Sequence, residues 1–204
     1  MHAILKATAS LSFAAAVATA AFAQAPAKVR VRGTVEKIEG AALTVKARDG
    51  TSVAIKLNDD WGVSAIVKAS RDDIKPGAFV GAGAMPQADG TQKAVQVFIF
   101  PEAMRGTGEG FRPWDFLPES TMTNATVAEA VAGVTKDSSS AVLTYKGGSQ
   151  KVTIPPDAMI ITLAPGDKAE LKVGAAVAVT ADKAADGTLT ASRLSVGRDG
   201  VTPN

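Results

Sequence analysis

An internal repeat constrains the fold of this chain more than any other feature of the sequence. The segment Ala88–Thr91 recurs as Ala185–Thr188, and Lys75–Val80 recurs at the same spacing as Lys172–Val177. One offset is therefore kept through a turn and the segments on either side of it. Such a repeat predicts that one small structural unit occurs twice in the chain.

The similarity continues upstream with a slightly different offset. Leu43–Lys46 parallels Leu143–Lys146, and Val53–Ile55 parallels Val152–Ile154. The register drifts near Trp61, where the first copy is longer, and we expect a loop there.

Both copies have the pattern of β-strands. Between positions 29 and 35, valines alternate with Arg30, Arg32 and Thr34, which is the period of a half-buried strand. Pairs such as Asp89-Gly90 supply the positive φ that tight hairpin turns need. Gly33 lies inside the first strand, where a bend or bulge is the usual explanation.

A short helical turn is also expected in each copy. Ser70 with Asp73, and Asp167 with Glu170, have the spacing of a capping box. Each turn falls between the third and fourth strand regions. Five strands with a small helix in that place are typical of an OB-type Greek-key barrel.

The sequence therefore predicts an all-β protein made of two tandem OB-like Greek-key barrels. We expect the first barrel domain at residues 24–100 and the second at residues 124–204. Residues 101–123 belong to neither copy and hold three aromatic side chains, Phe111, Trp114 and Phe116. A flexible spacer is poor in aromatic residues, so we expect an ordered connector.

Several of these segments resemble a known family. Gly33–Val35, the Asp-Gly hairpins, Lys172–Val177 and Asp186–Ala191 are similar to the exported bacterial domain family DUF5666. The resemblance extends over both halves but not over the connector. It implies a small OB-like β domain without an assigned activity, and it transfers no catalytic residues.

The first 23 residues read as a secretory signal peptide. They contain Lys6, an apolar run rich in Ala and Leu, and Ala21-Phe22-Ala23 before Gln24. This order predicts cleavage after Ala23. The alternative is an uncleaved anchor, for which the run is short and only moderately apolar. We therefore expect a periplasmic or secreted protein without a membrane span after cleavage.

Composition excludes several functional classes. The chain has no cysteine, and its one histidine, His2, lies in the expected signal peptide. A mature chain without imidazole or thiol cannot form a Ser-His-Asp or Cys-His site, a conventional zinc site or a c-type haem attachment. The charge is nearly balanced, which argues against nucleic acid as a partner. The composition predicts a protein that is not an enzyme and carries no cofactor.

The connector contains most of the candidate site residues. Arg105 and Arg112, together with Glu109 and Asp115, form either an anion site or ion pairs that brace the connector. Trp114 is either a packing anchor or a platform for a ligand. The glycines between positions 106 and 110 lack the sequence of a phosphate-binding loop.

Three further candidates lie in the first copy. Trp61 lies in the region that the second copy shortens, where a difference in binding is expected. Asp59 and Asp60 are weak candidates for ligands of a hard cation, because no EF-hand spacing surrounds them.

These observations favour a non-enzymatic binding or interaction module whose partner is a periplasmic protein or a small ligand. The alternative is an envelope accessory protein that handles a metal or small solute and binds a hard cation through carboxylates.

Overall fold

The computed structural model describes residues 27–132 and 139–203. The expected signal peptide, residues 1–23, lies outside the described residues. The described chain consists of strands and 3-10 turns, so the prediction of an all-β protein is confirmed. None of its helical turns is long and apolar enough to cross a membrane.

The two halves contain the same elements in the same order. The first half comprises β1 (Ala27–Glu39), β2 (Ala42–Ala47), β3 (Ser52–Lys68), the 3-10 turn η1 (Arg71–Asp73), β4 (Phe79–Pro86) and β5 (Gln92–Ile99). The second half comprises β7 (Thr121–Ala132), β8 (Ser139–Tyr145), β9 (Gly148–Ile154), β10 (Met159–Pro165), η3 (Lys168–Glu170), β11 (Ala176–Lys183) and β12 (Leu189–Gly197). The connector holds η2 (Glu102–Met104) and β6 (Gly110–Pro113). β9 and β10 together correspond to the single long strand β3.

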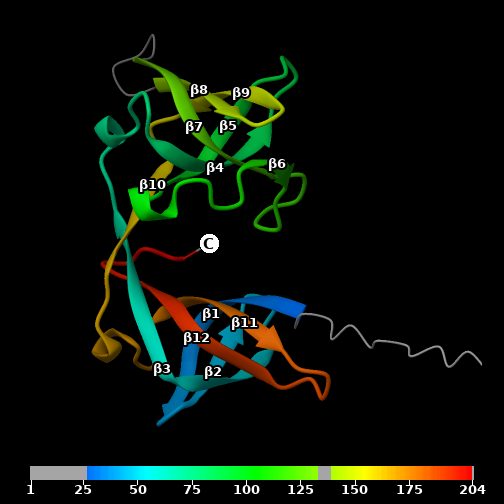
Figure 1. Ribbon diagram of the computed structural model, residues 1–204, viewed down its shortest axis with the longest axis vertical. Coiled ribbons are helices and arrows are strands. Elements are labelled where there is room, and N and C mark those ends of the chain that lie inside the picture. Colours follow the sequence, from blue (N-terminus) through cyan, green and yellow to red (C-terminus); the bar gives the residue numbers. More distant parts are fainter. Residues whose placement is uncertain (1–26, 133–138, 204) are drawn as a thin grey trace, which may run out of the picture.

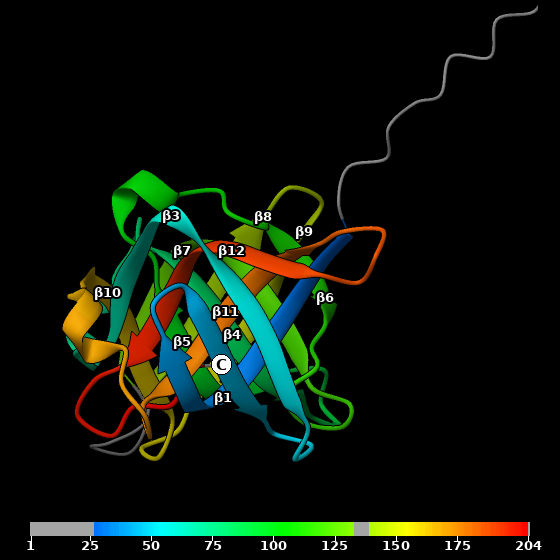
Figure 2. The same cartoon turned by 90° about the horizontal axis from the view of Figure 1, so that it is seen from below.

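One ring of strands, ring A, forms a closed five-stranded barrel. Its order is β1-β2-β3-β12-β11, with β11 antiparallel to β1 and β12 parallel to β3. Seen from below, its tilted strands cross one another obliquely around the long axis of the molecule (Figure 2). Its core contains the alternating apolar residues of all five strands, among them Val35, Leu57 and Val179.

A second set of pairings, ring B, is built in the same way. Its order is β7-β8-β9-β5-β4, with β4 antiparallel to β7 and a short parallel pairing between β5 and β9. Its core includes Val80, Val97, Leu143 and Ile154. The two rings lie one above the other (Figure 1).

Each ring draws strands from both halves of the sequence. β11 and β12 of the second half complete ring A, whereas β4 and β5 of the first half complete ring B. The expected division into contiguous barrels at 24–100 and 124–204 therefore does not describe the rings. The reason is that β3 continues past ring A and carries the chain to ring B, instead of folding back to complete its own ring.

β3 and β10 link the two rings and define a local symmetry. Ser64–Lys68 pairs antiparallel with Ile161–Pro165, and the central pair joins Ile66 to Leu163. These two residues are equivalent in the repeat, because 97 positions separate both Gly77 from Gly174 and Ile66 from Leu163. A pseudo-twofold axis therefore passes through this pair.

The 3-10 turns η1 and η3 follow the paired strands β3 and β10, and the residue after each turn packs into the core of a ring. Both have the expected capping box, with Ser70 and Asp167 accepting a backbone N–H and Asp73 and Glu170 accepting from the cap residue. The residue after η3, Leu171, is buried in the core of ring A. Its equivalent after η1 is buried in the core of ring B.

Gly33 has a different role from the bend that the sequence suggests. The bulge in β1 lies between Val35 and Lys37. A Cβ atom on Gly33 would overlap the backbone carbonyl of Lys46. Gly33 therefore permits β1 and β2 to approach closely.

A small third cluster fills the junction between the rings. Ile66, Ile161 and Val201 are buried together there. Val201 belongs to the segment after β12, which runs back between the rings (Figure 1). This segment positions Pro203 beside the functional site described below.

Candidate functional site

The connector is ordered, and several hydrogen bonds attach it to ring B. β6 pairs antiparallel with β7. Arg105 pairs with Glu102 at 2.5 Å and donates to the carbonyl of Gly77 at 2.9 Å. Glu109 accepts from the backbone N–H of Lys146 at 2.9 Å. The connector therefore forms a fixed wall along one side of ring B.

The tip of the connector reaches across to ring A. It is a tight loop in which the backbone N–H of Trp114 donates to the carbonyl of Ser120 at 2.8 Å. Within this loop, Asp115 pairs with Arg32 of β1 at 2.9 Å. The Phe116 ring lies 4.8 Å from the guanidinium of Arg48, which follows β2. The tip of the connector thus bridges the two rings.

Trp114 lies flat against the backbone of β4. A Cβ atom on Gly83 would overlap three atoms of the indole ring, so only glycine permits this approach. The indole also packs against Phe116, with ring centroids 4.8 Å apart. Trp114 is 9% exposed, so the side chain is fixed in place.

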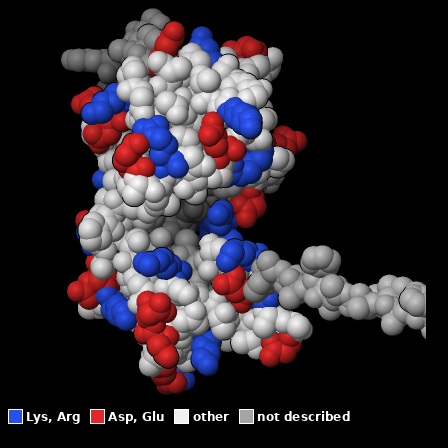
Figure 3. All heavy atoms as spheres, viewed as in Figure 1, with Lys and Arg blue, Asp and Glu red and all other residues white. Residues whose placement is uncertain are grey.

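A cavity of about 370 Å³ lies between the two rings and is closed on one side by the connector. Its apolar lining includes Ile66, Phe98, Phe100, Met104, Trp114, Met122, Ile161, Leu163 and Pro203. Its polar lining includes Arg30, Gln96, Thr107, Arg112, Asn124, Thr180 and Ser195. The waist between the rings is hollowed and mainly uncharged on the face seen in Figure 3, with basic and acidic side chains at its right margin.

The cavity lies on the pseudo-twofold axis, so equivalent positions face each other across it. Phe98 corresponds to Ser195, because they pair with the equivalent residues Gly81 and Ala178. In the same way Met122, opposite Gly83, corresponds to Arg30, opposite Thr180. At these positions ring B contributes an aromatic and a thioether side chain, whereas ring A contributes a hydroxyl and a guanidinium group.

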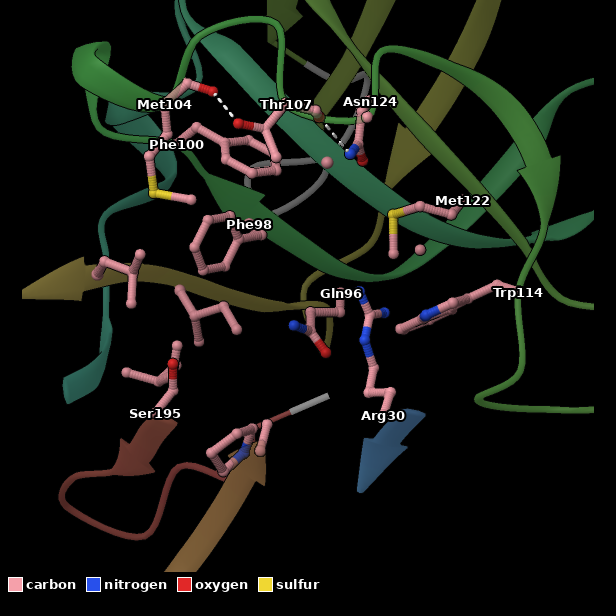
Figure 4. A pocket seen from close by; sticks show the side chains of 18 of the residues that line it. Arg30, Gln96, Phe98, Phe100, Met104, Thr107, Trp114, Met122, Asn124 and Ser195 are labelled. Atoms are coloured by element: carbon pink, nitrogen blue, oxygen red, sulfur yellow. Dashed lines mark hydrogen bonds between the residues drawn. The ribbon is translucent and has the colours of Figure 1, made fainter. Parts of the chain in front are cut away.

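The close-up view shows how these side chains are arranged. Phe98, Phe100 and Met104 gather at one side of the cavity, whereas Arg30 points from β1 toward Gln96 and Trp114 (Figure 4). The rings of Phe98 and Phe100 meet edge to face at 4.7 Å. The cavity therefore has an apolar end and a basic end.

Positive charge dominates around the basic end. Partial burial lowers the pKa of Arg30, and the Arg32 and Arg112 guanidinium groups lower it further, while Asp115 opposes them. Burial and Arg32 also lower the pKa of Arg48. The hydrogen bond from Arg32 holds the pKa of Asp115 below its ordinary value. The guanidinium groups of Arg32 and Arg112 thus lie near that of Arg30, with the Asp115 carboxylate beside them.

Two buried polar side chains near this cluster have unused hydrogen-bonding atoms. The Arg32 side chain is 8% exposed, and its Nε and Nη2 atoms have no partner. Asn124, which lines the cavity, donates from Nδ2 to the Thr107 carbonyl at 2.9 Å, but its Oδ1 atom has no partner. Unpartnered buried polar groups are rare and destabilising, and they are found where a ligand or water completes the bonding.

The predicted connector residues have different environments. Arg112 and Trp114 line the cavity. Asp115 lies beside it, paired with Arg32. Arg105 and Glu109 attach the connector to ring B instead.

The candidates in the first copy lie away from the cavity. Trp61 belongs to β3, not to a loop as the sequence suggested, and Lys168 lies 4.5 Å from its ring. Asp59 and Asp60 are exposed on the same strand. No group of three or more His, Asp or Glu residues that could hold a metal gathers within residues 27–132 and 139–203.

Sequence reasoning missed the residues that ring A contributes. Arg30 and Arg32 read only as the polar members of an alternating strand, and no sequence pattern singled out Asn124 as a site residue. Charged residues on the outer face of a strand are usually solvated. Only the tertiary structure shows that the connector covers the face of β1 that carries Arg30 and Arg32.

Comparison with known proteins gives a family match over part of the chain. No curated protein and no solved structure matches the chain. The family model that matches is described as a domain of unknown function, DUF5666, and it covers residues 131–195. That segment supplies β8 and β9 to ring B, and β11 with most of β12 to ring A; β10 lies beside β5 of ring B. The expected resemblance is therefore confirmed for the second copy, over residues 131–195. For the first copy it stays a prediction.

Proposed function

We propose that this chain is a non-enzymatic binding protein whose small ligand occupies the cavity between the rings. The observation that carries the proposal is the cavity itself, at which both rings and the connector meet. Its volume lies within the range of sites for small molecules, and its lining combines apolar walls with a few polar groups, as such sites do. The carboxylate alternative has less support, since none of the described lining residues is acidic.

We further propose that the two rings are OB-like barrels that have exchanged their last two strands. Each ring has five strands, one parallel closing pair and a 3-10 turn just before its fourth strand. This order supports an OB-type Greek-key arrangement. The exchange would place the ligand site in the cavity between the two barrels.

Export to the periplasm is part of the proposal. It rests on the sequence of residues 1–23. Expression of the full gene in a bacterial host, followed by N-terminal sequencing of the exported protein, should yield Gln24 as the first residue. A retained Met1 in a membrane fraction would contradict cleavage.

Binding is tested with a single-tryptophan protein. Trp61→Phe leaves Trp114, which lines the cavity, as the one tryptophan of the chain. Fractionated small molecules from a periplasmic extract should change the emission of Trp114, and native mass spectrometry should show a complex of defined mass.

A blocking variant separates binding in the cavity from binding elsewhere. Ser195→Phe fills the cavity with the side chain that the equivalent position, Phe98, already carries. Ser195→Ala is its matched control. Loss of the complex in the first variant and its retention in the second support the proposal. A complex that survives in Ser195→Phe places the ligand elsewhere and overturns it.

A further inference from the structure

Equivalent positions of the two halves of the chain face each other across the cavity but carry different side chains. Equivalent positions carry Phe98 and Ser195 on one pair of strands, and Met122 and Arg30 on another. A site at the axis of two identical units would favour a symmetric ligand. Divergence into an apolar side and a basic side instead favours a ligand with two chemically different ends.

We propose that the cavity binds a small aromatic carboxylate, with its rings against Phe98 and Phe100 and its carboxylate directed toward Arg30 and Arg112. This inference rests on the proposed binding function and adds the chemical class of the ligand.

The basic end supplies the first argument. Arg30 and Arg112 both line the cavity, and Arg32 is buried close to them with two unused donor atoms. Asp115 neutralises one guanidinium group at 2.9 Å. A ligand carboxylate would relieve the repulsion between the guanidinium groups of Arg30 and Arg112. It would also accept charge-assisted hydrogen bonds from these planar groups.

The apolar end supplies the second argument. Phe98 and Phe100 meet edge to face, and Met104 adds a polarisable thioether beside them. Aromatic ligands gain from offset and edge contacts with such rings, and thioethers add favourable contacts with ring edges. A cavity of about 370 Å³ replaces roughly a dozen water molecules. A bicyclic aromatic acid is of that size.

Asn124 adds a third, independent feature. Its Oδ1 atom is an acceptor without a donor, whereas its Nδ2 atom is already used by the Thr107 carbonyl. A hydroxyl group on the ligand ring would supply the missing donor. The preferred ligand therefore carries a carboxylate and a hydroxyl on one aromatic body.

The test is calorimetric titration of the mature chain with four probes of similar size: 2-naphthoate, 2-naphthalenemethanol, decanoate and 6-hydroxy-2-naphthoate. We expect 2-naphthoate to bind about tenfold more tightly than the neutral alcohol, because a charge-assisted bond is made only by the acid. It should also bind more tightly than decanoate. The hydroxylated acid should bind tightest, by about fivefold over 2-naphthoate.

Three variants assign these preferences to residues. Arg30→Gln and Arg112→Gln should each remove most of the preference for the acid over the alcohol. Asn124→Leu should remove the advantage of the hydroxyl group. Arg193→Gln is the matched control, because Arg193 is an exposed arginine of β12 outside the cavity, and it should change affinity by less than about twofold. Circular dichroism and thermal unfolding confirm that each variant is folded.

The outcomes separate this inference from the proposed function. Equal binding of 2-naphthoate and 2-naphthalenemethanol overturns the anionic class, and tighter binding of decanoate overturns the aromatic class. No binding of any probe, combined with an extract ligand that Ser195→Phe blocks, overturns the inference and leaves the binding function standing. No binding in either experiment overturns both.

Discussion

At the scale of single residues, glycine decides where Trp114 can lie. The absence of a side chain at Gly83 creates the flat surface that the indole covers. The equivalent position on ring A is Thr180, so an indole could not lie there in the same way. This difference permits the indole to pack on ring B and contributes to the asymmetry of the cavity.

We therefore expect Gly83→Ala to lower the free energy of unfolding by about 1–3 kcal/mol through overpacking. Gly62→Ala is the matched control, because the nearest atom to its new Cβ would be Arg193 Nη1 at 3.4 Å. Urea unfolding of both variants measures the difference. In the double variant Gly83→Ala/Trp114→Ala the two effects should fall short of their sum, whereas full additivity would contradict the contact.

The ion pair between Arg32 and Asp115 should make stability depend on pH. Because the pKa of Asp115 is lowered in the folded state by the Arg32 hydrogen bond, its contribution is fully present above the pKa of the unfolded carboxyl. That contribution is lost as pH falls through the folded pKa. In Asp115→Asn, the midpoint temperature of thermal unfolding should therefore fall less steeply as the pH is lowered through this range. Thermal unfolding at a series of pH values measures the difference. An unchanged pH profile would show that the pair does not contribute.

At the scale of elements, the 3-10 turns secure the exchange of strands. Arg71, the first residue of η1, donates to the carbonyls of Ile154, Pro155 and Pro156 between 2.9 and 3.3 Å. Its equivalent in η3, Lys168, instead lies over the ring of Trp61. Each turn thus attaches its own half of the chain to strands of the other half.

Replacing the two residues should have unequal effects. Arg71→Met leaves three carbonyl groups without their charged donor and should cost about 2 kcal/mol of unfolding free energy. Lys168→Met loses only an exposed cation–π contact and should cost less than about 1 kcal/mol. Chemical denaturation measures both. Equal losses of unfolding free energy in the two variants would show that the hydrogen bonds of Arg71 do not hold η1 to the second half of the chain.

At the scale of the whole molecule, the exchange of strands makes the two rings interdependent. Ring A cannot close without β11 and β12, and ring B cannot close without β4 and β5. The chain should therefore unfold as one unit rather than as two domains. Many pairings join residues far apart in sequence, so refolding should be slow for a chain of this length.

Cleavage of the connector tests this dependence. A protease site inserted between Pro118 and Glu119, which are both exposed, should yield two fragments that elute together in gel filtration. After separation in denaturant, neither fragment should refold alone, and mixing should restore the native circular dichroism spectrum. Independent refolding of either fragment would indicate contiguous barrels and contradict the exchange.

Local sequence patterns were sufficient for the elements and their repetition. Alternating apolar residues marked most strands, the Asp-Gly pairs marked turns, and the capping boxes at Ser70 and Asp167 marked both 3-10 turns. One detail of the alignment was wrong, because the sequence aligned Leu43 with Leu143. In the structure Val45 pairs with Val35 and Leu143 pairs with Val127, which is the equivalent of Val35, so Val45 is the counterpart of Leu143. A slip of two residues keeps the same face of a strand, so local patterns cannot detect it.

The sequence by itself determined that the chain is all-β, that a unit occurs twice and that the connector is ordered, because periodicity, turns and composition are local properties. Only the tertiary structure decided which strands complete which ring. Strands of either half have the same inward-facing apolar pattern, so each hairpin is compatible with both rings. The cavity follows from that choice, since Arg30, Phe98 and Trp114 come together only where the exchanged rings and the connector meet.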